Sequence, residues 1–144
     1  MIYLLDTNAC SLLARNMDAG LRARCDAHAG RLALSAVVWY ELVYGRERAP
    51  HLPQIAVRLA GLRELFPCLM PFDEGAAEGA ARVRAALESL KPNAQPIGPM
   101  DTLIAGHALS LPGCVLVTHN TRELRRVRES AGLALDVEDW QTVH

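Results

Sequence analysis

Short apolar runs alternate with longer helical patterns along this chain, and this alternation limits the folds that it can adopt. The predicted strands are residues 2–5, 31–35, 68–72, 115–118 and 133–137. The predicted helices are residues 9–15, 19–28, 36–48, 54–66, 74–90, 100 or 101–110, and 122–130. Strands and helices in this order favour an α/β fold of three α/β/α layers, in which helices cover both faces of a central parallel sheet.

Three local signals refine these elements. Ser35 is predicted to cap the helix that follows it. Pro71 cannot donate a backbone hydrogen bond to a neighbouring strand, so residues 68–72 are predicted to form an edge strand. The prolines and glycine between Lys91 and Pro99 predict a loop.

Length and composition indicate one domain over residues 1–144. Hydrophobic residues make up 51% of the chain and charged residues 22%, which excludes disorder as the main state. The longest apolar runs fall far short of the roughly 18 residues of a membrane span. No basic stretch leads into an apolar one at the N-terminus, where Asp6 interrupts the first run, so we expect a cytoplasmic protein without a membrane partner.

The cysteines and histidines lack the spacing of a zinc site. The four cysteines lie far apart without a C-x-x-C pair, which favours buried free thiols. The five histidines are scattered, and His107 is interpreted as a core or surface residue rather than a ligand.

The charge balance permits two interpretations. A net charge of −1 argues on its face against a nucleic-acid partner. However, fourteen of the fifteen basic residues are arginine, whose side chain suits bidentate phosphate contacts. Four of these cluster late in the chain, at Arg122, Arg125, Arg126 and Arg128. They form either an RNA-binding surface or a solvated helix face balanced by neighbouring glutamates.

Three acidic residues occupy positions where a core or a strand end is expected. Asp6 directly follows the first strand, Glu41 lies among apolar residues of its helix, and Asp101 opens another helix. Each has a structural alternative: Asp6 as a helix N-cap, Glu41 as a buried acid paired with an arginine, and Asp101 as a partner of the helix dipole. Three such acids from three segments are harder to explain as separate structural features.

The strand at 115–118 ends in further oxygen-bearing groups. Thr118 and Asn120 either satisfy backbone groups in a turn or join the three acids. A site with only oxygen ligands suits Mg²⁺ or Mn²⁺, which use one or two carboxylates and keep several waters. A cation there can activate water and stabilise the charge that develops on a phosphodiester.

The chain resembles the VapC toxins, which are ribonucleases of the PIN-domain family. The matching segments are residues 5–8, 35–45, 97–105, 118–123 and 137–140. The resemblance runs nearly end to end and implies a Mg²⁺-dependent endoribonuclease, the toxin of a type II toxin–antitoxin pair. It also implies inhibition by a cognate antitoxin, a homodimer, a toxin–antitoxin hetero-oligomer, and RNA, with tRNA the expected class, as substrate.

The same resemblance implies roles for individual residues. Asp6 and Asp101 would be the principal Mg²⁺ ligands, and Glu41 would complete the catalytic acids. Many relatives carry aspartate where this chain has Asn120, so either Asn120 or Glu123 would fill the fourth position. The residues expected to support the catalytic groups are Thr7, Asn8, Thr118 and Glu123.

Three other functions compete with this hypothesis. A haloacid-dehalogenase phosphatase would need a second aspartate where Asn8 stands, and a lysine, of which Lys91 is the only example. A degenerate relative that binds RNA or a partner without cutting is supported by Asn120 and opposed by the intact acids. A housekeeping PIN nuclease would share the chemistry but not the toxin role.

Overall fold

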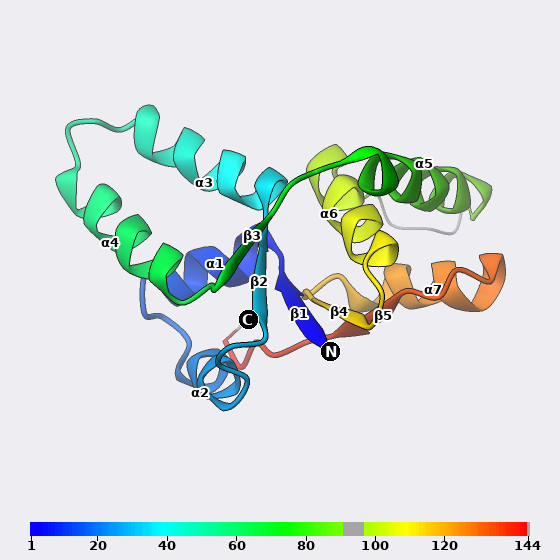
Figure 1. The fold of residues 1–144 in the computed structure, drawn as a ribbon, viewed down its shortest axis with the longest axis horizontal. Helices are drawn as coiled ribbons and strands as arrows, with labels where there is room; N and C mark the ends of the chain where they lie inside the picture. Colours follow the sequence, from blue (N-terminus) through cyan, green and yellow to red (C-terminus); the bar gives the residue numbers. More distant parts are fainter. Residues whose placement is uncertain (91–96, 144) are drawn as a thin grey trace.

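The computed structural model describes residues 1–90 and 97–143, which include a five-stranded parallel sheet of order β3-β2-β1-β4-β5 (Figure 1). The strands are β1 (Ile2–Leu5), β2 (Leu32–Ser35), β3 (Cys68–Met70), β4 (Cys114–Val117) and β5 (Asp136–Glu138). The predicted edge position of β3 is confirmed.

Seven helices of the described part surround the sheet. They are α1 (Thr7–Ala14), α2 (Ala19–Ala27), α3 (Ala36–Glu47), α4 (Pro53–Glu64), α5 (Glu74–Ser89), α6 (Pro99–Ser110) and α7 (Thr121–Ala131). Helices α1 to α4 lie on one side in Figure 1 and α5 to α7 on the other, which confirms the three-layer α/β/α prediction.

Helices α1 and α6 begin earlier than predicted because of the residues at their N-termini. Helix α1 begins at Thr7, since the Asp6 carboxylate accepts a hydrogen bond from the Ala9 N–H. Helix α6 begins at Pro99, a first-turn position where proline's missing N–H has no helical partner to lose. Most of the predicted loop before α6, residues 91–96, lies outside the described residues.

The last strand begins later than predicted. The Leu135 N–H donates to the Leu133 carbonyl at 2.8 Å, and this tight turn interrupts the extended backbone expected from residue 133. Strand β5 therefore begins at Asp136. Leu135 is buried all the same, so its apolar character reflects core packing and not strand pairing.

Helices α5 and α6 pack unusually closely on one face of the sheet. A Cβ added at Gly106 would lie only 2.6 Å from the Gly79 carbonyl carbon and closer still to the Ala80 backbone. Glycine at position 106 therefore allows the two helix backbones to approach, and this contact fixes where α6 lies.

The cysteine prediction holds for three of the four residues. Cys10, Cys25 and Cys114 are buried free thiols, whereas Cys68 is exposed. The prediction was wrong for Cys68 because it opens the short edge strand β3, whose residues Cys68 and Leu69 are both exposed.

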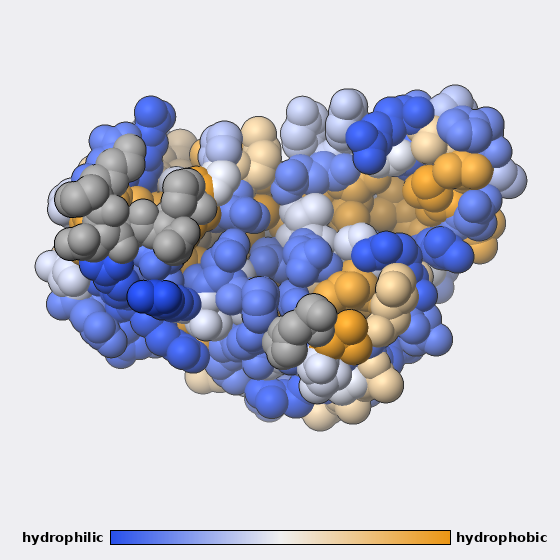
Figure 2. All heavy atoms as spheres, turned by 180° about the vertical axis from the view of Figure 1, so that it is seen from behind, coloured by the Kyte–Doolittle hydropathy of each residue, from blue (hydrophilic) through white to orange (hydrophobic). Residues whose placement is uncertain are grey.

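Several apolar side chains of the α3–α4 hairpin remain on the surface. Tyr40, Tyr44, Leu52 and Val57 are exposed. Seen from behind, hydrophobic residues also line a hollow in the part of the molecule built by α3 and α4 (Figure 2). No helix of the described part is long and apolar enough to cross a membrane.

Candidate active site

The candidate site lies where the strand order reverses. The chain adds β2 and β3 on one side of β1, and β4 and β5 on the other. In open parallel sheets, ligands bind beyond the carboxyl ends of the strands at such a reversal. Asp6 follows β1 there, and Thr118 follows β4.

Asp6 is buried and held by two hydrogen bonds. Its Oδ1 accepts from the Ala9 N–H at 2.8 Å, and its Oδ2 accepts from the Thr118 hydroxyl at 2.7 Å. The N-cap interpretation of Asp6 is thus correct, and the same carboxylate also bridges β1 to β4. Burial raises the pKa of Asp6, against the lowering effect of both hydrogen bonds, and the negative charges of Asp101 and Asp139 raise it further.

Asp101 lies in the first turn of α6, partly buried. Burial raises the pKa of its carboxyl group, and the negative charge of Glu41 acts in the same direction. Glu41 on α3 is half-buried and accepts a hydrogen bond from the Thr7 hydroxyl of α1. The three predicted acids therefore share one electrostatic neighbourhood, since Asp101 interacts with both Asp6 and Glu41.

Asp6 and Asp101 offer carboxylate oxygens, the ligand type that a hard divalent cation prefers. Within residues 1–90 and 97–143, no three His, Cys, Asp or Glu side chains are grouped closely enough to hold a metal by themselves. No lysine or arginine of that part forms an ion pair with Asp6 or Asp101. Mg²⁺ commonly binds one or two carboxylates and keeps the rest of its shell as water, so these two acids fit such an ion.

The remaining predicted residues lie at different places. Thr118 touches Asp6 directly, and its Oγ1 also accepts from the Asn120 N–H at 3.1 Å. Asn120 is exposed at the N-terminus of α7, where its side chain forms no capping hydrogen bond. Asn8 is exposed on the first turn of α1.

Glu123 is buried next to arginines. Its two carboxylate oxygens have no hydrogen-bond partner in the described residues, and Oε2 lies 3.5 Å from Nη1 of Arg126. Arg122 is farther, at 4.0 Å from Oε1. No described contact joins Glu123 to Asp6 or Asp101. Glu123 therefore does not support these two acids directly.

The predicted arginine surface is divided. Arg122 and Arg125 are exposed on α7, Arg126 is partly buried beside Glu123, and Arg128 forms an ion pair with Asp136. The first two side chains are therefore the most accessible to a ligand phosphate.

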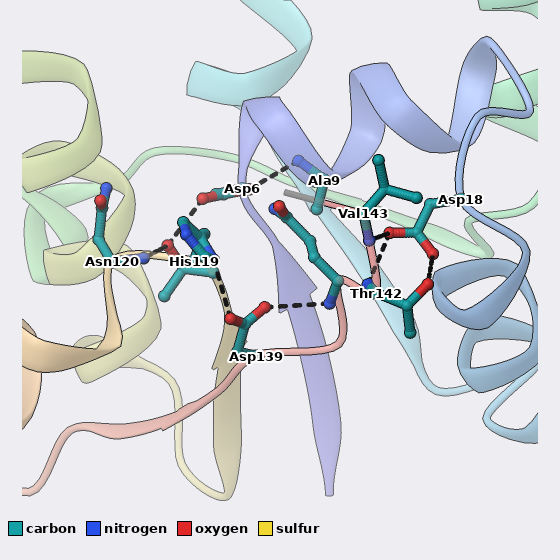
Figure 3. A network of polar contacts seen from close by, with 10 residues as sticks. Asp6, Ala9, Asp18, His119, Asn120, Asp139, Thr142 and Val143 are labelled. Atoms are coloured by element: carbon teal, nitrogen blue, oxygen red, sulfur yellow. Dashed lines mark hydrogen bonds and ion pairs between the residues drawn. The ribbon is translucent and has the colours of Figure 1, made fainter.

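Asp139 is an acid of this region that sequence reasoning missed. It follows β5, whose last carbonyl, that of Glu138, accepts from the Thr118 N–H at 2.9 Å. Its Oδ2 lies 2.9 Å from Nδ1 of His119 (Figure 3), and its negative charge raises the pKa of Asp6. One signal was available, since Asp139 follows a strand just as Asp6 does.

The segment carrying Asp139 is anchored beyond it. The buried Asp18 carboxylate, the N-cap of α2, accepts from the Leu21 N–H, from the Thr142 N–H and hydroxyl, and from the Val143 N–H (Figure 3). The hydrogen bond with the Thr142 hydroxyl contributes most to lowering the pKa of Asp18 far below its ordinary value. This network fastens the C-terminal residues to α2.

The chain matches known proteins over nearly its whole length. The model of the PIN domain family matches residues 3–130. The tRNA(fMet)-specific endonuclease VapC of Shigella flexneri is 36% identical over 141 residues, covering 96% of this chain and 97% of that protein. The enzyme of the same name from Salmonella typhimurium is 34% identical over 140 residues, with coverage of 96% and 97%.

Solved structures give the same result. A DNA-bound VapBC from Salmonella typhimurium superposes with a TM-score of 0.80 at 31% identity, covering 97% of this chain and 98% of that one. VapBC2 from Rickettsia felis, bound to a DNA fragment from its promoter, has a TM-score of 0.81 at 26% identity, with coverage of 98% and 100%. The chain therefore belongs to the PIN domain family and, within it, to the VapC ribonucleases.

Proposed function

We propose that this chain, acting as one domain over residues 1–144, is a divalent-cation-dependent endoribonuclease and the toxin of a type II toxin–antitoxin pair. The observation that carries the cation dependence is the pair Asp6 and Asp101. Burial and like charge raise the pKa of both carboxyl groups, and no described cation pairs with either. Such a pair is costly unless a positive ion joins it.

Asp6 and Asp101 would hold Mg²⁺, or Mn²⁺ in its place. The bound ion would activate water and stabilise the charge that develops on the phosphodiester. Thr118 orients Asp6 through its hydroxyl, and Thr7 orients Glu41 in the same way. Glu41 would accept a hydrogen bond from the attacking water and so align it with the phosphate.

The proposed site includes three further polar residues, which are Asn120, Asn8 and Glu123. Asn120 is exposed beside Thr118, so its side-chain carbonyl is available to a water or to the substrate. Asn8 is exposed next to Thr7, the hydrogen-bond partner of Glu41, and would contact substrate. Glu123 would act through Arg126, whose charge it partly neutralises.

RNA is the proposed substrate, and tRNA the expected class because two relatives are named as tRNA(fMet)-specific endonucleases. Arg122 and Arg125 would contact backbone phosphates first, since both are exposed on α7. Arg126 and Arg128 already have acidic neighbours and would contribute less. Because a tRNA substrate would be met in the cytoplasm, we propose that the chain acts there.

The proposed partners are a cognate antitoxin and a second copy of the chain. The solved relatives are VapBC complexes, which supports an antitoxin. Exposed aromatic and aliphatic side chains on the α3–α4 hairpin also favour a protein partner, because large apolar groups are seldom left in water together.

The proposal is tested by mapping RNA ends after a total tRNA and ribosomal RNA pool is incubated with the purified chain. We expect discrete new ends with Mg²⁺, none with a chelator, and none with Asp6→Asn. Asp26→Asn is the matched control, because this exposed aspartate pairs only with Arg22 on the surface of α2 among the described ion pairs. Equal cleavage by Asp6→Asn and wild type would contradict the proposal.

A further inference from the structure

His107 is a buried polar residue that the proposed reaction does not use. It lies on α6 with only 1% of its surface exposed, and its Nδ1 is 2.8 Å from the hydroxyl oxygen of Ser35, which is fully buried. The two residues are 72 positions apart. Because a polar group is costly to bury without a partner, this hydrogen bond joins two distant segments in one arrangement.

The Ser35 hydroxyl has a hydrogen that it can donate to the His107 ring. Its oxygen already accepts from the Val37 N–H at 3.1 Å, as the N-cap of α3. Its own hydrogen is then available to donate to Nδ1 of His107, which requires a neutral ring with the proton on Nε2. Burial lowers the pKa of His107, against a smaller opposing effect of Asp73, and so favours this neutral form.

The hydrogen bond links the two segments that carry proposed catalytic acids. Asp101 lies six residues before His107 on α6, and Glu41 lies six residues after Ser35 on α3. At a rise of about 1.5 Å per residue, each acid is roughly 9 Å along its helix from the link. On the α5 side, Gly106 holds α6 against α5, so α6 is fixed by neighbours on two sides.

We propose that His107 is a positioning residue that, by accepting the Ser35 hydrogen bond, sets the separation between Asp101 on α6 and Glu41 on α3. The proposal rests on the proposed function in one respect, which is that Asp101 holds a divalent cation while Glu41 aligns the attacking water. His107 itself touches neither the cation nor the substrate. Its loss should therefore weaken cation binding and slow cleavage without changing the affinity for RNA.

The test compares His107→Asn with His107→Gln in the full-length chain. The asparagine amide reaches the place of Nδ1 and can still pair with Ser35, whereas the glutamine amide reaches the place of Nε2. Mn²⁺ binding is measured by calorimetry, thermal unfolding checks the fold, and kcat and KM are determined separately on RNA. His51, which is exposed, supplies the matched control variants His51→Asn and His51→Gln.

We expect His107→Asn to bind Mn²⁺ within about threefold of wild type and His107→Gln to bind about tenfold more weakly. The kcat of His107→Gln should fall by a similar factor while KM stays unchanged. Equal Mn²⁺ binding by the two variants, whether retained or lost in both, would overturn the positioning role. A wild-type chain that binds Mn²⁺ but cuts no RNA would overturn the proposed function alone, and one that binds no Mn²⁺ would overturn both.

Discussion

The close packing of α5 on α6 makes Gly106→Ala the most informative single substitution. The new methyl carbon would lie 2.6 Å from the Gly79 carbonyl carbon, while ordinary contacts begin near 3.4 Å. It would be closer still to the backbone of Ala80, and backbone atoms cannot rotate away as a side chain can. The two helices must therefore separate by roughly 1 Å, which forfeits a quarter to a half of each contact's dispersion energy across the interface.

Overpacking of this kind costs about 1–3 kcal/mol, and the better helix propensity of alanine offsets about 1 kcal/mol. We expect a net loss of up to about 2 kcal/mol in the free energy of unfolding. This corresponds to roughly 2–4 °C in Tm for each kcal/mol. Since α6 also carries Asp101, a displacement near 1 Å should reduce the cleavage rate by up to about 100-fold.

Urea unfolding followed by circular dichroism, together with an RNA cleavage assay, measures both effects. The matched control is Gly61→Ala on α4, where an added Cβ meets no atom within 4 Å. That change should stabilise the chain by about 0.5–1 kcal/mol. If Gly106→Ala proved as stable as Gly61→Ala, the packing argument for the position of α6 would be wrong.

The carboxylates with shifted pKa values make both stability and cleavage depend on pH. Burial raises the pKa of Asp101 above its ordinary value of 3.8. At pH values just above 3.8 the folded state therefore binds more protons than the unfolded state, and the free energy of unfolding falls as the pH rises through this range. Metal-free Asp101→Asn should therefore unfold at a higher temperature than wild type at pH 7, and a lower Tm would contradict this. Thr118→Val removes a hydrogen bond that lowers the pKa of Asp6, so the acidic limb of the pH–rate profile should move to higher pH. An acidic limb at the same pH as in wild type would contradict this role of Thr118. The lowered pKa of Asp18 stabilises the fold above its ordinary value of 3.8, and this contribution is lost as pH falls. Asp18→Asn should therefore lower Tm at pH 7 more than at pH 3, and an equal drop at both would exclude this role.

The order of strands and helices could be predicted because short buried strands leave a clear apolar pattern. Asp6 and Thr118 were found in the same way, since parallel strands bring their carboxyl ends to one edge. The start of β5 could not be predicted, because Leu133 and Leu135 are apolar for packing while their backbone turns. Asp139 was missed as a site residue because the last strand was predicted to end at residue 137, whereas β5 ends at Glu138, directly before Asp139. Its place beside β4 also depends on the pairing of the two strands.

Side-chain partners were the least predictable part of the site. The face of α7 that packs on the core includes Glu123 as well as the neighbouring Leu124. The Glu123 carboxylate is therefore buried, and it lies beside Arg126. His107 could be interpreted only as a core or surface residue, because its partner Ser35 is distant in sequence. For both residues the sequence identifies the titratable side chain, but the packing of the helices determines which partner it contacts.

We propose above that Asp6 and Asp101 together hold the divalent cation on which RNA cleavage depends. Single-turnover cleavage of labelled tRNA by wild type and Asp101→Asn, at saturating Mg²⁺ and at matched folded fractions, tests it most directly. We expect Asp101→Asn to lose at least about 100-fold in rate while it remains folded. Undiminished cleavage by folded Asp101→Asn, or wild-type cleavage that needs no divalent cation, would contradict it.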